Sequence, residues 1–150
     1  MSSYTANAKR TALRTGEVSG VPKVPALTYS APPEFKGQEN IWSPEHLFVA
    51  AIATCFINTF EAIAEFSKFS FVALEASAEG VLQKGEGGYR FTHVTVRPTL
   101  RISDEADRER ALRLLEKSEK ACLVSRSISS EITLEPTILT TADTGQATGA

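Results

Sequence analysis

The 150-residue sequence lacks several features that mark large functional classes. It has no excess of positive charge, because 16 Lys and Arg residues face 18 Asp and Glu residues and the formal net charge is −2. Proteins that bind nucleic acid broadly usually carry a basic face, so we expect no nucleic-acid partner. The residues after Met1 lack the apolar core of a signal peptide, and no apolar run reaches the length of a membrane span. We therefore expect a cytoplasmic protein without a membrane partner.

Histidine and cysteine are scarce as well, with two of each. His46, His93, Cys55 and Cys122 are scattered along the chain and lack the paired spacing of zinc ligands. The Gly-Glu-Gly-Gly sequence at 85–88 lacks the Lys-Ser/Thr pair and the following helix of a phosphate-binding loop. We therefore expect neither a metal ion nor a cofactor.

The chain does contain enough apolar material for one core, since 42% of its residues are hydrophobic. A length of 150 residues is typical of a single domain. We expect that domain over residues 1–140. Residues 141–150 are small and polar, and we expect them to form a flexible tail.

The apolar pattern predicts an α+β fold. Ser43-Pro44-Glu45 is typical of a helix start, because Ser can cap, Pro suits the first position and Glu favours the positive end of the helix dipole. This helix should run to about Phe66, and its apolar surface on every side indicates a central position. The other expected elements are an extended segment over 4–18, a short strand over 26–30, a hairpin of strands over 71–84 and 89–102, a second helix starting at 103–105, and a last strand over 129–140. The second helix has one side with the spacing i, i+4, i+7, i+11, which we expect to face the core, opposite mainly charged and solvated sides: Ala111, Leu115, Ser118 and Cys122.

The two cysteines occupy unlike settings. Cys55 lies deep in the apolar helix, whereas Cys122 lies where the second helix ends. Both are packing groups in one interpretation, since free cysteine is usually a small buried hydrophobe. They form a redox pair in the other, since cysteine pairs in a reducing compartment are more often catalytic or redox-sensing than structural. The negative C-terminal end of a helix disfavours a thiolate, so Cys55 would then attack and Cys122 would resolve.

A reactive Cys55 needs a cation nearby, because only the thiolate attacks and burial raises the pKa of a thiol. The charged residues close to it in sequence are acids, so Arg10 and Arg14 in the first extended segment are the candidates. Glu45 is available to hold the arginine in a bidentate pair. Glu45 and Cys55 are 10 residues apart, about 15 Å along a helix. Either a long arginine bridges them, or the carboxylate comes from the antiparallel helix of a partner chain.

The sequence also resembles a known family in two places. The stretch that begins Ser43-Pro44-Glu45-His46 and ends Ala53-Thr54-Cys55-Phe56 resembles the central helix of the OsmC/Ohr family, the osmotically induced and organic hydroperoxide resistance proteins. Cys122-Leu123-Val124-Ser125 resembles the family's second cysteine region, although proline often follows that cysteine in the family. The order of the expected elements also fits the family up to about residue 138.

The resemblance implies an OsmC-like α+β fold of antiparallel sheets around a central buried helix, in an intertwined homodimer with two sites at the subunit interface. It implies a cysteine-based peroxidase that reduces organic hydroperoxides to alcohols and takes electrons from a dithiol, often on a lipoylated protein. Cys55 matches the peroxidatic cysteine and Cys122 the resolving cysteine, which together form a disulfide, and Glu45 and Arg14 match the family's site glutamate and arginine. The alternatives are a non-enzymatic dimer that binds an apolar small molecule, and a redox sensor.

Overall fold

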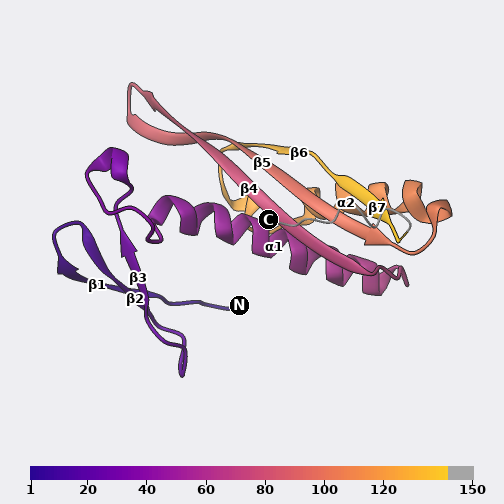
Figure 1. Cartoon of the computed structure of the whole chain (residues 1–150), viewed down its shortest axis with the longest axis horizontal. Coiled ribbons are helices and arrows are strands. Elements are labelled where there is room, and N and C mark those ends of the chain that lie inside the picture. Colours follow the sequence, from indigo (N-terminus) through magenta and orange to yellow (C-terminus); the bar gives the residue numbers. More distant parts are fainter. Residues whose placement is uncertain (142–150) are drawn as a thin grey trace. The chain divides into compact units, whose positions relative to one another are not determined.

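The computed structural model describes residues 1–141 and divides the chain into two compact units, Met1–Phe48 and Val49–Ala150. Figure 1 shows the elements of both units, coloured along the sequence. The single domain expected over 1–140 remains a prediction. Residues 142–150, which hold most of the expected tail, lie outside the described residues.

The first unit contains a three-stranded antiparallel sheet in the order β1-β2-β3. Its strands are β1 (Asn7–Ala12), β2 (Thr15–Ser19) and β3 (Leu27–Ser30), and a 3-10 turn, η1 (Pro33–Phe35), follows. The short strand expected over 26–30 is therefore confirmed as β3.

The single extended segment expected over 4–18 was wrong, because the chain turns back between β1 and β2. Arg14 lies in this turn with a φ of 57°, in the left-handed region. Residues other than glycine rarely adopt that conformation, and the usual Asn-Gly or Asp-Gly signal of a hairpin is missing. The sequence therefore gave no local sign of the turn.

Helix α1 (Pro44–Phe66) begins and ends where the sequence predicted. The Ser43 hydroxyl accepts a hydrogen bond from the His46 N–H at 3.1 Å, which satisfies one of the free donors of the first turn. The same hydroxyl lies 2.7 Å from Nδ1 of His46. Ser43 is thus the cap that the sequence indicated.

The second unit contains a four-stranded sheet whose centre is a long antiparallel hairpin. The hairpin consists of β4 (Ala73–Gly85) and β5 (Gly88–Ile102), as predicted, and Gly85 pairs with Gly88 at its turn. The second long edge of β5 carries β6 (Glu131–Leu134) and β7 (Thr137–Thr140), which pair with it in parallel. The sheet is therefore mixed and not purely antiparallel.

The single last strand expected over 129–140 was wrong in one respect, since it is divided into β6 and β7. Pro136 lies between them, and proline has no N–H to donate to a neighbouring strand. Both pieces keep the same offset along β5, with Val96 opposite Leu134 and Thr99 opposite Thr137. They are one edge strand interrupted by proline.

Helix α2 (Arg108–Ala121) is preceded by a 3-10 turn, η2 (Glu105–Asp107), and followed by another, η3 (Ser125–Ser127). The Asp104 side chain caps η2 by accepting a hydrogen bond from the Ala106 N–H at 2.9 Å. The face predicted to be buried is buried in full, and each of its members is 0% exposed: Ala111, Leu115, Ser118 and Cys122. The apolar period of the sequence therefore placed this helix correctly.

The core of the second unit lies between its helices and one face of the sheet (Figure 1). Alternate residues of β5 point into it, and they meet buried residues of α1 and α2: Val94, Val96, Leu100, Ile102, Ile52, Phe56, Phe60 and Leu115. Gly80 of β4 permits the close approach of α1, since a Cβ there would lie 2.7 Å from the Phe91 ring and 2.9 Å from Val49. The α+β class is confirmed.

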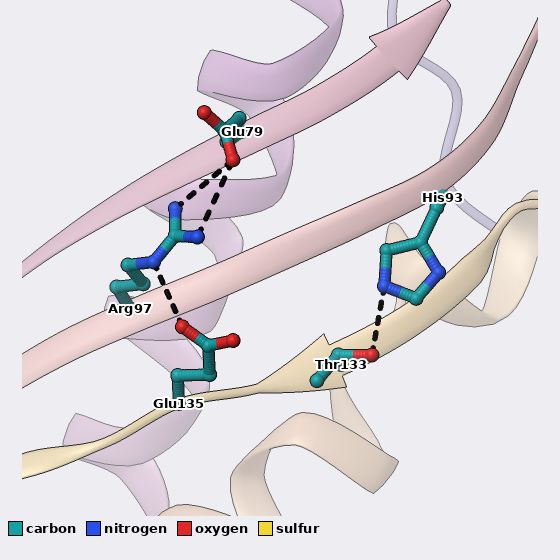
Figure 2. A network of polar contacts seen from close by, with 5 residues as sticks. All are labelled: Glu79, His93, Arg97, Thr133 and Glu135. Atoms are coloured by element: carbon teal, nitrogen blue, oxygen red, sulfur yellow. Dashed lines mark hydrogen bonds and ion pairs between the residues drawn. The ribbon is translucent and has the colours of Figure 1, made fainter. Parts of the chain in front are cut away.

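The opposite face of the sheet is polar, and Figure 2 shows its side chains with helical ribbons behind the strands. Arg97 of β5 donates to Glu135 at 2.9 Å and to Glu79 of β4 at 3.3 Å. His93 Nε2 lies 2.8 Å from the Thr133 hydroxyl of β6. These cross-strand contacts tie three strands together on the exposed face, and exposed pairs of this kind fix register more than they add stability.

Among the described residues, α1 is the one helix whose length and composition would allow it to cross a membrane. The expectation that no apolar stretch reaches that length was therefore wrong, because Glu61 and Glu65 come only near the helix end. The core helix of a soluble protein passes the same test, and α1 packs a stripe of residues into the core of the second unit. The finding is weak evidence for a membrane.

Candidate functional site

The structure brings the two cysteine thiols close together. Cys55 lies near the middle of α1 and Cys122 caps the end of α2. Both are buried and free, and they lie close enough for each thiol to shift the pKa of the other. This proximity arises because each sulfur lies on a helix that packs on the same face of the β4–β5 sheet. Their roles as attacking and resolving thiols remain predictions.

Several groups around Cys55 favour its charged form. The Thr59 hydroxyl, one helical turn further along α1, lies 3.8 Å from the Cys55 sulfur and also donates to the Cys55 carbonyl at 2.7 Å. The backbone of Leu123 and Val124, which line the same cavity as Cys55, also lowers the pKa of this thiol. A sulfur that accepts several hydrogen bonds is stabilised as the thiolate.

The pKa of Cys55 reflects a balance between burial and these donors. Burial raises the pKa and is the largest single influence, but the neighbouring polar groups together outweigh it, and the pKa of Cys55 lies below its ordinary value. The groups that lower the pKa, from the largest influence to the smallest, are the backbone of Val124, the thiol of Cys122, the hydroxyl of Thr59 and the backbone of Leu123.

Cys122 shows the opposite result. Burial raises the pKa of the Cys122 thiol most, and the neighbouring Cys55 raises it further. The side chain and the backbone of Ser125 lower the pKa without reversing the shift. Cys55 therefore ionises first, and Cys122 stays protonated beside it.

An apolar cavity of about 660 Å³ opens beside the Cys55 sulfur. Of the described residues that line it, only Lys117 is charged. The wall comes mainly from α1, the end of α2 and the segment after it: Ala51, Thr54, Cys55, Asn58, Thr59, Ala62, Ile63, Phe66, Lys117, Ala121, Leu123 and Val124. The cavity can hold the hydrocarbon part of a small molecule against the thiol.

The predicted arginine and glutamate belong to the first unit. Arg10 lies in β1, and Arg14 lies in the β1–β2 turn, where its carbonyl accepts a hydrogen bond from the Ala31 N–H at 2.9 Å. Glu45 lies in the first turn of α1. Among the described residues, its Oε2 is a buried side-chain oxygen without a hydrogen-bond partner. A buried carboxylate oxygen needs a hydrogen-bond donor. The pairing of an arginine with Glu45 therefore remains a prediction, and this need is the physical reason for it.

Sequence reasoning missed two hydroxyl groups and the backbone groups near the sulfurs. Thr59 lies four residues after Cys55 and Ser125 three residues after Cys122, and these spacings could have revealed both hydroxyls. The backbone donors left no trace in the sequence, because an N–H group belongs to every residue except proline. The described residues contain no group of three or more His, Cys, Asp or Glu side chains that could hold a metal ion.

We predict that iodoacetamide modifies Cys55 ahead of Cys122 across a pH series. The lowered pKa of Cys55 keeps a larger fraction of it ionised as the pH falls, whereas the raised pKa of Cys122 makes it lose its thiolate first. Peptide mass spectrometry measures the two rates, and unfolding in guanidinium should remove the difference. A lower pH midpoint for Cys122 would contradict this assignment.

Comparison with known proteins places the chain in a family. The model of the family described as OsmC-like protein matches residues 37–137. The uncharacterized protein YmaD of Bacillus subtilis is 28% identical over 109 residues, which cover 71% of this chain and 73% of that protein.

Solved structures agree on the fold. An OsmC-like protein of unknown function from Vibrio cholerae has a TM-score of 0.80 and 21% identity, covering 91% of this chain and 99% of that one. An organic hydroperoxide resistance protein OsmC from Legionella pneumophila has a TM-score of 0.74 and 24% identity, covering 93% and 99%. The organic hydroperoxide resistance protein OhrB of Bacillus subtilis has a TM-score of 0.67 and 21% identity, covering 91% and 97%. Because the family match spans well over half of its length, the chain belongs to the OsmC-like family.

Proposed function

We propose that the chain is a thiol peroxidase that reduces organic hydroperoxides to alcohols, with Cys55 as the attacking thiolate and Cys122 as the resolving thiol. The observation that carries the proposal is the proximity of two buried free thiols whose surroundings favour ionisation of one over the other. Two structural relatives are named organic hydroperoxide resistance proteins, which supports the same reaction class.

In the first step the Cys55 thiolate attacks the distal oxygen of the hydroperoxide. A sulfur–oxygen bond forms and the oxygen–oxygen bond breaks. The distal oxygen keeps its hydrogen, so Cys55 becomes a sulfenic acid directly, and the alkoxide leaves as an alcohol after taking up one proton from water.

In the second step the Cys122 sulfur attacks the sulfenic sulfur of Cys55. A disulfide forms, the sulfur–oxygen bond breaks, and hydroxide leaves with the proton of Cys122 as water. A dithiol then reduces the disulfide and is itself oxidised to a disulfide, which restores both thiols. We propose a dihydrolipoyl group, free or on a protein, as this dithiol, and the cytoplasm as the compartment, because such recycling needs reducing surroundings.

The cavity gives the proposal its substrate preference. Its wall is mostly apolar and it adjoins the Cys55 sulfur. Burial of the alkyl chain of a substrate there contributes favourable binding free energy, which hydrogen peroxide cannot gain because it has no alkyl chain. We propose that alkyl or lipid hydroperoxides are preferred over hydrogen peroxide for this reason.

The proposed dimer accounts for the surface of α1. The helix is apolar on every side, yet only one stripe of it is buried, and residues such as Ala51, Thr54, Asn58 and Phe66 are exposed. Small residues on that surface allow close approach of a second helix. The same residues line the cavity. A second copy of the chain, packed with its own α1 in the antiparallel direction, would cover this apolar surface and form the outer wall of the cavity.

We predict that Cys55→Ser abolishes consumption of cumene hydroperoxide. Cys122→Ser should react with about one equivalent of peroxide and then stop, because its sulfenic acid has no thiol to resolve it. The unmodified chain should lose about two protons in intact mass after one equivalent of peroxide. A coupled assay with dihydrolipoamide and intact-mass spectrometry measure these outcomes.

Undiminished turnover in Cys55→Ser would end the peroxidase proposal. An unchanged mass in the unmodified chain, combined with thermal stabilisation by apolar ligands, would favour a binding protein instead. A single oxidation without dithiol-driven turnover would favour a redox sensor.

The proposed arginine is tested by conservative substitution. Arg14→Lys keeps the charge but loses the planar fork that pairs with Glu45, so kcat/KM should fall by roughly 10²-fold. Glu45→Gln should cause a similar loss, and the double variant should lose little more than either single one, because the pair acts as a unit. Arg10→Lys is the matched control. If Arg10→Lys reduces kcat/KM and Arg14→Lys does not, the role passes to Arg10.

We predict a homodimer in sedimentation experiments, with twice the chain mass of 16.2 kDa. Ala51→Glu places a charge in the proposed helix contact and should shift the equilibrium to monomers, because the charge would be buried without a partner. Glu65→Gln, on the same helix, removes a charge and serves as the control. A monomer at every concentration of the unmodified chain would disprove the dimer.

A further inference from the structure

The wall of the cavity beside Cys55 contains few polar side chains. Apart from the cysteine, the described residues that line it include two threonines, one asparagine and one lysine: Thr54, Thr59, Asn58 and Lys117. A hydroperoxide bound there presents two oxygens, and only a side chain with an unused hydrogen can donate to them. The hydrogen bonds already present in the structure therefore decide which of these side chains can act on a substrate.

The hydrogens of the two threonine hydroxyls are already used. Thr54 donates to the Ala50 carbonyl at 2.8 Å. Thr59 donates to the Cys55 carbonyl at 2.7 Å and lies 3.8 Å from the Cys55 sulfur. Both are the bonds to the preceding turn that threonine commonly forms inside a helix. Because a hydroxyl has one hydrogen, neither threonine has another to donate to a ligand in the cavity.

Asn58, in contrast, keeps its hydrogens. Its side-chain amide carries two N–H groups, and within residues 1–141 no hydrogen bond engages it. The residue is exposed in the single chain, where water can satisfy the amide. In the proposed dimer a second chain covers this part of the cavity, and a buried amide without an acceptor is costly. An oxygen of a bound ligand would supply that acceptor.

The position of Asn58 relative to Cys55 suits a donor to the substrate. Asn58 follows Cys55 by three residues in α1, and both residues line the cavity. Residues three apart on a helix have their Cβ atoms about 5–6 Å from each other. The Cα–Cβ bonds of a helix tilt toward its N-terminus, so the Asn58 side chain starts out in the direction of the turn that holds Cys55. A hydroperoxide at the sulfur therefore lies within reach of the amide.

We propose that Asn58 is a further catalytic residue of the peroxidase, whose side-chain amide donates a hydrogen bond to the leaving oxygen of the hydroperoxide. The proposal deepens the peroxidase function and rests on it. The Cys55 thiolate attacks the distal oxygen, and the electron pair of the breaking oxygen–oxygen bond moves to the proximal oxygen. The amide stabilises the negative charge that develops there. The alkoxide takes its proton from water and leaves as an alcohol, and the amide keeps both of its hydrogens.

Lys117 is the other side chain of this wall with hydrogens to donate, but it is less suited to the role. It belongs to α2 and is exposed. Its ammonium group is strongly hydrated and sits on a flexible four-carbon stem. A donor that is held in place needs no reorganisation when the charge develops, which makes it the more effective stabiliser. The short side chain of Asn58 meets that condition better.

The first test compares two leaving groups. Asn58→Leu keeps the approximate shape of the side chain and removes both N–H groups. Cumene hydroperoxide expels an alkoxide, and the rate constant of Cys55 oxidation should fall by roughly 10²-fold in this variant. A protonated peroxycarboxylic acid expels a carboxylate, whose charge is shared by two oxygens, so the loss with that oxidant should be much smaller. Stopped-flow kinetics of the reduced protein measure both rate constants.

The controls separate the amide from the thiolate and from the wall. Iodoacetamide has no peroxide oxygen, so it should alkylate Cys55 at the same rate in Asn58→Leu and in the unmodified chain. Thr54→Val is the matched variant of the wall, because the lost hydroxyl hydrogen is bonded within α1, and it should change the rates with the two oxidants by the same factor. Asn58→Gln retains an amide and should recover part of the rate with cumene hydroperoxide.

Equal losses with both oxidants in Asn58→Leu would overturn the proposal, because the amide would then act on the fold, the thiolate or the subunit contact. A selective loss in Lys117→Met and none in Asn58→Leu would also overturn it and would give the role to Lys117. Consumption of cumene hydroperoxide at the same rate by the unmodified chain and Asn58→Leu would defeat the Asn58 proposal and leave the peroxidase intact. If the unmodified chain consumes neither oxidant, both proposals fail.

Discussion

The close approach of the Cys55 and Cys122 thiols is the constraint on which the rest of the site depends. It exists because α1 and α2 pack on one face of the β4–β5 hairpin, each with its cysteine toward the other helix. Burial alone would make both thiols unreactive, because a charged sulfur is costly in an apolar environment. The four groups that lower the pKa of Cys55 together outweigh the effect of burial on it. The negative charge that Cys55 then carries raises the pKa of Cys122 further. A small asymmetry of hydrogen bonding thus gives two identical side chains different chemistry.

Much of this arrangement could be predicted from the sequence. Ser43 and Pro44 marked the start of α1. A regular helical spacing identified the buried face of α2, which consists of Ala111, Leu115, Ser118 and Cys122. Such patterns are reliable because capping and helical period are local properties of the chain. Cys55 and Cys122 are 67 positions apart, the difference between 122 and 55, so their proximity is not a local property of the chain. It followed from chemical reasoning and from the family resemblance.

The parts that could not be predicted depend on backbone groups or on rare conformations. Arg14 turns the chain in a left-handed conformation that its residue type does not announce. Pro136 divides an edge strand, yet proline is tolerated in some edge strands and the pattern around it remained that of one strand. The backbone groups of Leu123 and Val124 carry no sequence signal at all. Glu45 is an intermediate case, since the sequence proposed its partner and the structure supplies a buried carboxylate oxygen that needs one.

The interruption between β6 and β7 also governs how this edge of the sheet meets other chains. Pro136 has no N–H, so the exposed backbone of this edge strand lacks one hydrogen-bond donor between β6 and β7. The neighbouring Glu135 is charged and accepts a hydrogen bond from Arg97. An incoming strand would find only two short runs of four residues to pair with, broken by a residue that cannot donate. This border is therefore a poor template for cross-chain sheet growth, which protects the protein from aggregating through it.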